Sequence, residues 1–111
     1  MTAVLDADRV RALNDIRRRT LSGGTLVLTA GVVALGRERQ RAILDAVAAF
    51  DHFDADNDPY SEHDFGAVEA AGERVFWKID CYDRSGHYAS PDPADNSVTR
   101  RVLTVMLGEE Y

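Results

Sequence analysis

The sequence predicts an α+β domain in which two helices pack on one face of an antiparallel sheet of about four strands. Apolar residues recur at helical spacing in two segments of the N-terminal half, and the period changes to two after residue 64. The 111 residues, 45% of them hydrophobic, suffice for one core and not for two. We therefore interpret residues 1–111 as a single domain.

The first predicted element is an amphipathic helix that begins near Asp6 or Asp8, because either carboxylate can cap a helix N-terminus. Arg17–Arg19 fall in its last turn, where cations face the negative end of the helix dipole, and Gly23 with Gly24 ends it. The apolar stripe that should face the sheet consists of Val10, Leu13 and Ile16.

A short β-branched and aliphatic run, Thr25–Thr29, predicts a buried strand, which we expect at the centre of the sheet with Val27 in the core. After a turn near Gly36, a second helix should extend from about Glu38 to Asp51. Its apolar stripe consists of Ile43, Val47 and Phe50.

Two runs on either side of Gly72, Phe65–Ala71 and Glu73–Tyr82, predict a β-hairpin. Ser90–Asp95, rich in Pro and Asp, predicts a rigid irregular loop. The last run, Val98–Leu107, is rich in Val and Thr and favours a strand, although its valines also fit helical spacing. The residues of these runs that should face the helices are Val75, Trp77, Ile79, Cys81 and Val102.

Charge is distributed unevenly along the chain, whose formal net charge is −6. Residues 1–41 hold eight Arg and four acids, a balance of +4, whereas residues 42–111 hold five bases and fifteen acids, a balance of −10. The acidic loop, residues 51–64, holds six acids and no Lys or Arg. Such a segment repels anions, so we do not expect direct nucleic-acid binding and interpret the N-terminal arginines as solvated helix faces.

The acidic loop also contains possible metal ligands. Its alternating acids from Asp54 onward resemble a calcium loop, but Pro59 stands where that loop needs Gly and Phe65 where it needs a bidentate Glu. We therefore expect no metal and no cofactor, and interpret Asp58-Pro59 as a turn. The alternative is a cation that activates water in a hydrolase or nuclease, held by Asp58, Glu62, His63 and Asp64.

Cys81, the only cysteine, excludes an internal disulfide, and its place among apolar residues favours core packing over nucleophilic catalysis. The opposite face of the same predicted strand carries Phe76, Lys78 and Tyr82, which form a second candidate surface unless the Ser90–Asp95 loop covers Phe76. No apolar run reaches the roughly 20 residues that cross a bilayer, and no signal peptide is evident, so we expect a cytoplasmic protein.

Short motifs along almost the whole chain resemble those of one bacterial family. They are Asn14-Asp15, Leu26–Val32, Asp56–Pro59, Glu62–Phe65, Phe76–Asp80, Ser90–Asp95 and Arg101–Leu107. Together they are similar to the bacterial domain-of-unknown-function family 3768, which has no established activity to carry over. Its members are small stand-alone proteins often carried on plasmids and other mobile DNA, and the resemblance implies that context rather than a mechanism.

We therefore expect a small acidic binding protein rather than an enzyme. Its partner should be a basic surface on a host protein of a nucleic-acid-processing or defence system, in the manner of an anti-restriction or anti-CRISPR inhibitor. The candidate binding residues are Asp54, Asp56, Asp58, Glu62, His63, Asp64, Phe76, Lys78 and Tyr82. Besides the metal-assisted hydrolase or nuclease, a homo-oligomeric module that pairs its last strand with a copy of itself is an alternative.

Overall fold

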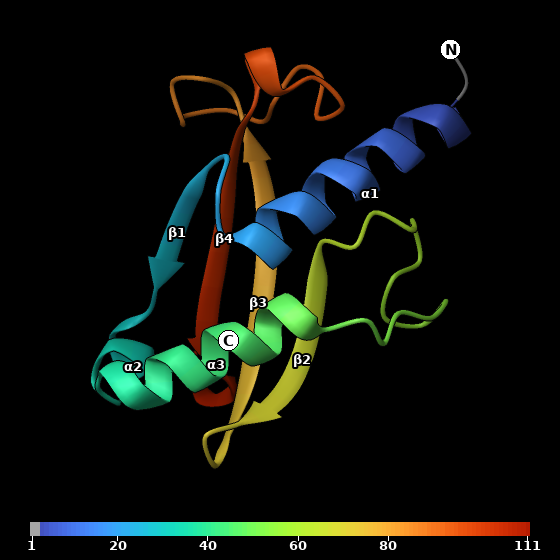
Figure 1. Ribbon diagram of the computed structural model, residues 1–111. Helices are drawn as coiled ribbons and strands as arrows, with labels where there is room; N and C mark the ends of the chain where they lie inside the picture. The colour runs from blue at the N-terminus through green and yellow to red at the C-terminus, as the bar shows by residue number, and fades with distance from the viewer. Residues whose placement is uncertain (1–2) are drawn as a thin grey trace.

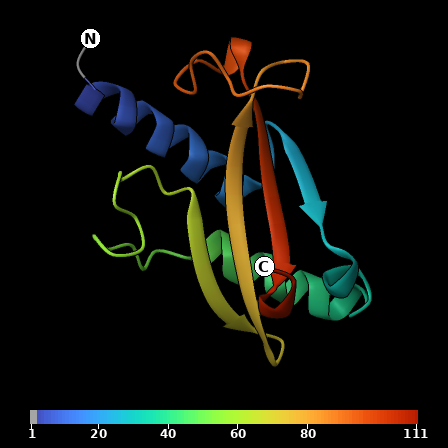
Figure 2. The same ribbon diagram turned by 180° about the vertical axis from the view of Figure 1, so that it is seen from behind.

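Helices α1 (Ala3–Thr20) and α3 (Arg37–Ala49) form one layer, and a four-stranded sheet forms the other, in the computed structural model, which describes residues 3–111 and the side chains from Asp6 onward. Both helices lie across the same face of the sheet (Figure 1). Seen from behind, the other face has no described α-helix across it (Figure 2). The predicted α+β class is confirmed, with the short helix α2 (Ala30–Val33) in addition.

The sheet contains β1 (Thr25–Leu28), β2 (Phe65–Ala70), β3 (Glu73–Tyr82) and β4 (Arg100–Leu107) in the order β1-β4-β3-β2. The β2–β3 and β3–β4 pairs are antiparallel, but β1 is parallel to β4. The expectation of a purely antiparallel sheet with β1 at its centre was therefore wrong. The chain leaves β1 through two helices instead of a hairpin turn, so local turn geometry does not set the direction of this pair.

The predicted hairpin is confirmed, and a two-residue turn joins β2 to β3. Ala70 pairs with Glu73, and between them Ala71 and Gly72 both have left-handed backbone angles, φ 53° and 77°. Two such residues make the turn whose twist matches that of paired strands. The ambiguous last run is a strand, preceded by a single 3₁₀ turn at Asn96–Val98.

The core lies between the sheet and the helices, with Trp77 fully buried at its centre. Two predicted core residues are exposed instead: Ile16, with 56% of its surface accessible, and Val27, with 39%. Val27 belongs to the edge strand β1 and pairs with Thr104, so it lies on the uncovered sheet face. Val102, which pairs with Asp80, lies on that face as well, so its predicted position facing the helices was also wrong. The residues that are buried as predicted are Val10, Ile43, Val47, Val75, Trp77 and Ile79.

The face of α1 that meets the rest of the molecule is largely polar. Its buried residues follow helical spacing but are Val10, Asn14, Arg17 and Arg18. Asp6 lies in the first turn of α1, which begins at Ala3, rather than at the predicted cap position. The apolar stripe of this segment therefore predicts the helix correctly but not the residues of its buried face.

Candidate functional site: an acidic groove beside α1

Arg18 connects α1 to the end of α3. Its Nη1 donates to the carbonyl oxygens of Val47, Ala48 and Phe50 at 2.9, 3.0 and 2.7 Å, and its Nη2 donates to Asp15 at 3.1 Å. Burial lowers the pKa of this guanidinium, and Asp15 opposes that shift. Arg17 and Arg18 are buried, so the interpretation of these two arginines as a solvated helix face was wrong. Neither is available to phosphates of a nucleic acid.

His63 attaches the acidic loop to α1. Its Nδ1 lies 2.9 Å from Asp15 Oδ1, and its Nε2 lies 3.5 Å from Asp58 Oδ2. The ring stacks on Phe53, with centroids 3.6 Å apart and planes within 5°, and Phe53 in turn packs edge-on against Trp77. Both ring nitrogens therefore face carboxylates of this chain, which leaves neither directed at a ligand.

Two acids of the acidic loop hold its backbone in shape. Asp54 Oδ1 accepts from the amides of Asp56 and Asn57 at 2.9 and 3.0 Å. Asp58 Oδ1 accepts from the amides of Glu62 and His63, both at 3.1 Å, and the Asp58 residue is 8% exposed. The predicted turn at Asp58-Pro59 is present, because the Ser61 amide bonds to the Asp58 carbonyl at 3.1 Å. These two acids thus support the loop, while Asp56 points into solvent.

On the other side of α1, the structure forms what we call the acidic groove. Its outer part, of about 500 Å³, lies between the start of α1, the end of the acidic loop and the Pro91–Ala94 loop. Its inner part, of about 220 Å³, reaches the end of β3. The lining residues of the outer part are Asp6, Ala7, Val10, Tyr60, Glu62, Pro91, Asp92, Pro93 and Ala94; those of the inner part are Val10, Asn14, Glu62, Asp64, Ile79, Asp80, Cys81 and Pro93.

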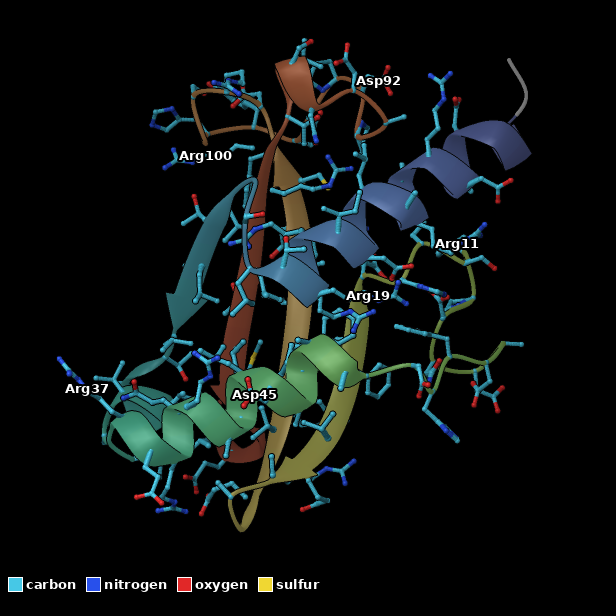
Figure 3. All side chains as sticks on the ribbon, in the orientation of Figure 1. Arg11, Arg19, Arg37, Asp45, Asp92 and Arg100 are labelled. Carbon is cyan, nitrogen blue, oxygen red and sulfur yellow. The ribbon has the colours of Figure 1, made fainter. Side chains whose placement is uncertain are left out.

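The groove combines negative charge with an apolar lining. Five acidic residues line it, and no Lys or Arg of the described chain does. Asp92 projects from the loop at one end of the sheet, whereas Arg11 lies on the side of α1 that meets the acidic loop (Figure 3). Arg11 is engaged there by Asp8 at 2.7 Å and by the Ser61 carbonyl at 3.2 Å. Arg11 is therefore held away from the groove.

Burial and mutual repulsion act together on two carboxylates of the inner part. The pKa of Glu62 is raised by desolvation and then by the charges of Asp64 and Asp58. The pKa of Asp64 is raised by desolvation and by Asp58 and Asp80. A cation beside these carboxylates would favour their charged forms and so offset both effects.

Asn14 and Arg101 form the wall behind the inner part. Asn14 Nδ2 donates to the Glu62 carbonyl at 2.9 Å, and Arg101 Nε donates to Asn14 Oδ1 at 2.9 Å. The other nitrogens of Arg101 bond to Asn96 and to the Pro93 carbonyl. Each guanidinium nitrogen of Arg101 is therefore engaged, one by Asn14 and two by the loop that forms the groove.

Cys81 is half-buried on the helix side of β3, beside the core as predicted. Desolvation raises the pKa of its thiol, with Arg101 opposing the shift. A raised pKa favours the unreactive thiol over the thiolate nucleophile. Among the described residues, no group of three or more His, Cys, Asp and Glu side chains is arranged to hold a metal ion.

The structure separates the predicted binding residues into three places. Asp54, Asp58 and His63 line a pocket of about 450 Å³ beside Arg11, and Asp56 lies exposed on the same loop. Glu62 and Asp64 line the groove, whereas Phe76, Lys78 and Tyr82 lie on the uncovered sheet face. Phe76 is not covered by the Ser90–Asp95 loop, contrary to that alternative; it packs on Phe65 and Tyr111, with centroids 5.6 and 4.9 Å away. Lys78 pairs with Asp80 at 3.1 Å. One acidic surface and one aromatic surface thus face different directions.

Comparison with known proteins gives a family and no function. A family model described as a protein of unknown function, DUF3768, matches residues 28–110. The chain belongs to this family. No curated protein and no solved structure matches it. The DUF3768 match includes the acidic loop and the Pro91–Ala94 loop, while the helix that completes the groove, α1, precedes the matched range.

Sequence reasoning missed part of the groove in this DUF3768 protein. Asp6 was read as a helix cap, and Asp92 as part of a rigid loop, yet both line the outer part beside Tyr60, which is 77% exposed. The sequence feature that indicates Asp92 is the Pro-Asp-Pro motif at residues 91–93, because two prolines restrict the loop backbone and hold the acidic side chain between them in place. Among the described helices, none has the length and apolar character needed to cross a bilayer.

Proposed function

We propose that this protein binds a basic segment of a partner protein through the acidic groove. The observation that carries the proposal is the lining of the groove, which combines five acidic residues and no Lys or Arg of the described chain with apolar walls from α1 and the Pro91–Ala94 loop. A partner with Lys or Arg next to apolar residues matches both properties at once.

A protein segment fits this groove better than a nucleic acid or a free metal ion. Phosphates would be repelled by Glu62, Asp64 and Asp92, and the buried Arg17 and Arg18 cannot compensate. Besides its three acids, the outer part is lined by apolar residues such as Ala7 and Pro91, and a hard cation gains nothing from these apolar groups. The apolar lining favours a ligand that has an apolar part of its own.

The partner class that we propose is a host protein that handles nucleic acid, in restriction, CRISPR or related defence. Such proteins present Lys and Arg where they hold phosphates, so an acidic protein that occupies that surface would act as an inhibitor. The resemblance of the motifs to proteins of mobile DNA supports this choice. The proposal assigns no catalytic step to the protein.

A pull-down with matched variants tests the proposal. The groove variant carries Asp6→Asn and Asp92→Asn, and the control variant carries Glu38→Gln and Asp45→Asn at exposed positions of α3, of which Figure 3 labels Asp45. Both variants lose two negative charges. We expect wild type and control to retain one basic nucleic-acid-handling protein from host extract, and the groove variant to lose it as raised salt does.

Equal loss in both variants would show that net charge alone attracts the partner. Retention by all three proteins would place the binding surface elsewhere, with Phe76, Lys78 and Tyr82 as the next residues to change. Either result would contradict the proposed function.

A further inference from the structure

We propose that the inner part of the acidic groove binds one arginine side chain of the partner, with Glu62 and Asp64 as its carboxylate acceptors. The outer part then binds the partner residues on either side of that arginine. This inference rests on the proposed function and specifies which residue the groove recognises. It makes the inner part the specificity-determining half of the site.

The size and shape of the groove favour a side chain that enters from the outer part. The inner part, of about 220 Å³, is smaller than the roughly 300–1,000 Å³ of pockets for small molecules. Val10, Glu62 and Pro93 line both parts, so the two lie side by side. A long side chain can therefore place its stem along Val10 and Pro93 and its charged end beside the carboxylates.

The acceptors of the inner part are free to bind. Within the described residues, the Glu62 and Asp64 carboxylates make no ion pair and no hydrogen bond to another residue, whereas Asp54, Asp58 and Glu110 are all engaged. Desolvation already raises the pKa of both free groups. Keeping these two carboxylates ionised therefore costs free energy, and an incoming cation would reduce that cost.

Arginine suits this site better than lysine. The guanidinium is planar, is weakly hydrated and donates in a fork that a carboxylate accepts at two oxygens, so it loses less on entering a half-buried pocket. It also stacks on flat surfaces, and Tyr60 and Pro91 provide them at the entrance. Lysine carries a compact and strongly hydrated charge, which favours the exposed acids of the outer part.

The test uses ¹⁵N-labelled protein and three synthetic peptides, N-acetyl-Gly-Leu-Xaa-Leu-Gly-amide, in which Xaa is Arg, Lys or citrulline. Citrulline has nearly the shape of arginine without its charge. We expect the Arg peptide to shift the backbone amide signals of Ala7, Val10, Glu62, Asp64 and Ala94 and to bind at least tenfold more tightly than the citrulline peptide. Lys should bind more weakly than Arg.

Matched variants distinguish binding in the inner part of the groove from general electrostatic attraction to the acidic protein. Glu62→Gln with Asp64→Asn should weaken binding of the Arg peptide tenfold or more, whereas Asp56→Asn with Asp51→Asn, on exposed positions of the acidic loop, should leave it within twofold. Circular dichroism checks that both variants fold. Equal weakening by the two pairs, or equal binding of Arg and citrulline peptides, would overturn the inference.

The outcomes also distinguish this inference from the proposed function. If Lys and Arg peptides bind alike and only Asp6→Asn with Asp92→Asn weakens them, the groove binds basic segments but the arginine pocket is refuted. If no basic peptide shifts any groove signal and the pull-down retains no basic protein, both proposals fail.

Discussion

His63 and Asp15 join two segments that are 48 residues apart, with 2.9 Å between the imidazole Nδ1 and the Asp15 Oδ1. Asp15 also accepts from Arg18, which caps the end of α3. The acidic loop, α1 and α3 therefore meet at one polar centre that rests on the ring of Phe53. The position of Tyr60 and Glu62 in the groove depends on this centre.

Replacing His63 should loosen the acidic loop. His63→Ala removes the stack on Phe53 and the contact with Asp15, which together contribute about 2 kcal/mol to stability. Urea unfolding followed by fluorescence of Trp77, the only tryptophan, measures the change. His52→Ala, on an exposed position of the same loop, is the control and should change stability by less than about 0.5 kcal/mol. Equal effects would show that His63 is not a tether.

Gly66 and Gly72 should respond differently to alanine. A Cβ on Gly66 would lie 2.5 Å from Trp77 Nε1, so Gly66→Ala must displace the indole, at about 3 kcal/mol. A Cβ on Gly72 meets nothing within 4 Å, and Gly72→Ala costs only the left-handed backbone strain, about 1 kcal/mol. The emission maximum of Trp77 should move in the first variant alone. A larger loss for Gly72→Ala would contradict this packing.

Arg18 and Arg19 are neighbours with opposite surroundings. Arg18→Ala removes three bonds to the end of α3 and the contacts of the guanidinium with Trp77 and Phe53, so we expect a loss of about 3 kcal/mol or more. Arg19→Ala, whose side chain is 57% exposed and 4.0 Å from Asp15, should cost less than about 0.5 kcal/mol. Thermal unfolding of both variants makes the comparison, and similar melting temperatures would refute it.

Two glutamates should give stability a pH dependence of opposite sign. The pKa of Glu62 is raised in the folded protein by desolvation, so its contribution to stability is present below the ordinary pKa of Glu and is lost as pH rises through the folded pKa. The pKa of Glu110 is lowered by bonds from Thr29 and the amides of Leu107 and Gly31, so its contribution is present above the ordinary pKa and is lost as pH falls through the folded pKa.

At pH 7, Glu62→Gln should therefore be more stable than wild type and Glu110→Gln less stable. Both differences should shrink when urea unfolding is repeated near pH 4. If both variants changed stability in the same direction at pH 7, the direction of one of the two pKa shifts would be wrong.

The fold could be predicted where apolar residues mark the buried side of an element. Ile43 and Val47 on α3, and Trp77 and Ile79 on β3, are buried at the predicted spacing. Prediction failed on α1 because Asn14 and Arg18 are buried there through hydrogen bonds that no apolar pattern reveals. Arg17 is buried beside them with a single bond, from Nη1 to the Ser22 carbonyl at 3.4 Å, while its Nε and Nη2 have no partner among the described residues. A buried arginine looks the same in a sequence as a solvated one.

The candidate site was predicted only in part for a similar reason. The density of acids marked the acidic loop, and Glu62 and Asp64 do line the groove. Sequence alone could not show that Asp54 and Asp58 bond to their own loop, or that Asp6 and Asp92, 86 residues apart, face the same space. The bonds of Asp54 and Asp58 depend on the local turn geometry of the loop, and the meeting of Asp6 with Asp92 depends on long-range packing between α1 and the Pro91–Ala94 loop.

The pairing of β1 has a consequence for how the protein is made. Among the described strands, β1 neighbours β4 alone, and Thr25 pairs with Val102, so β1 must wait for a strand that is synthesised more than 70 residues later. Until then Leu26 and Leu28, which pack against the core in the finished protein, lack their sheet partner. A nascent chain halted before residue 100 would carry a free strand edge, which is a feature that chaperones and proteases recognise.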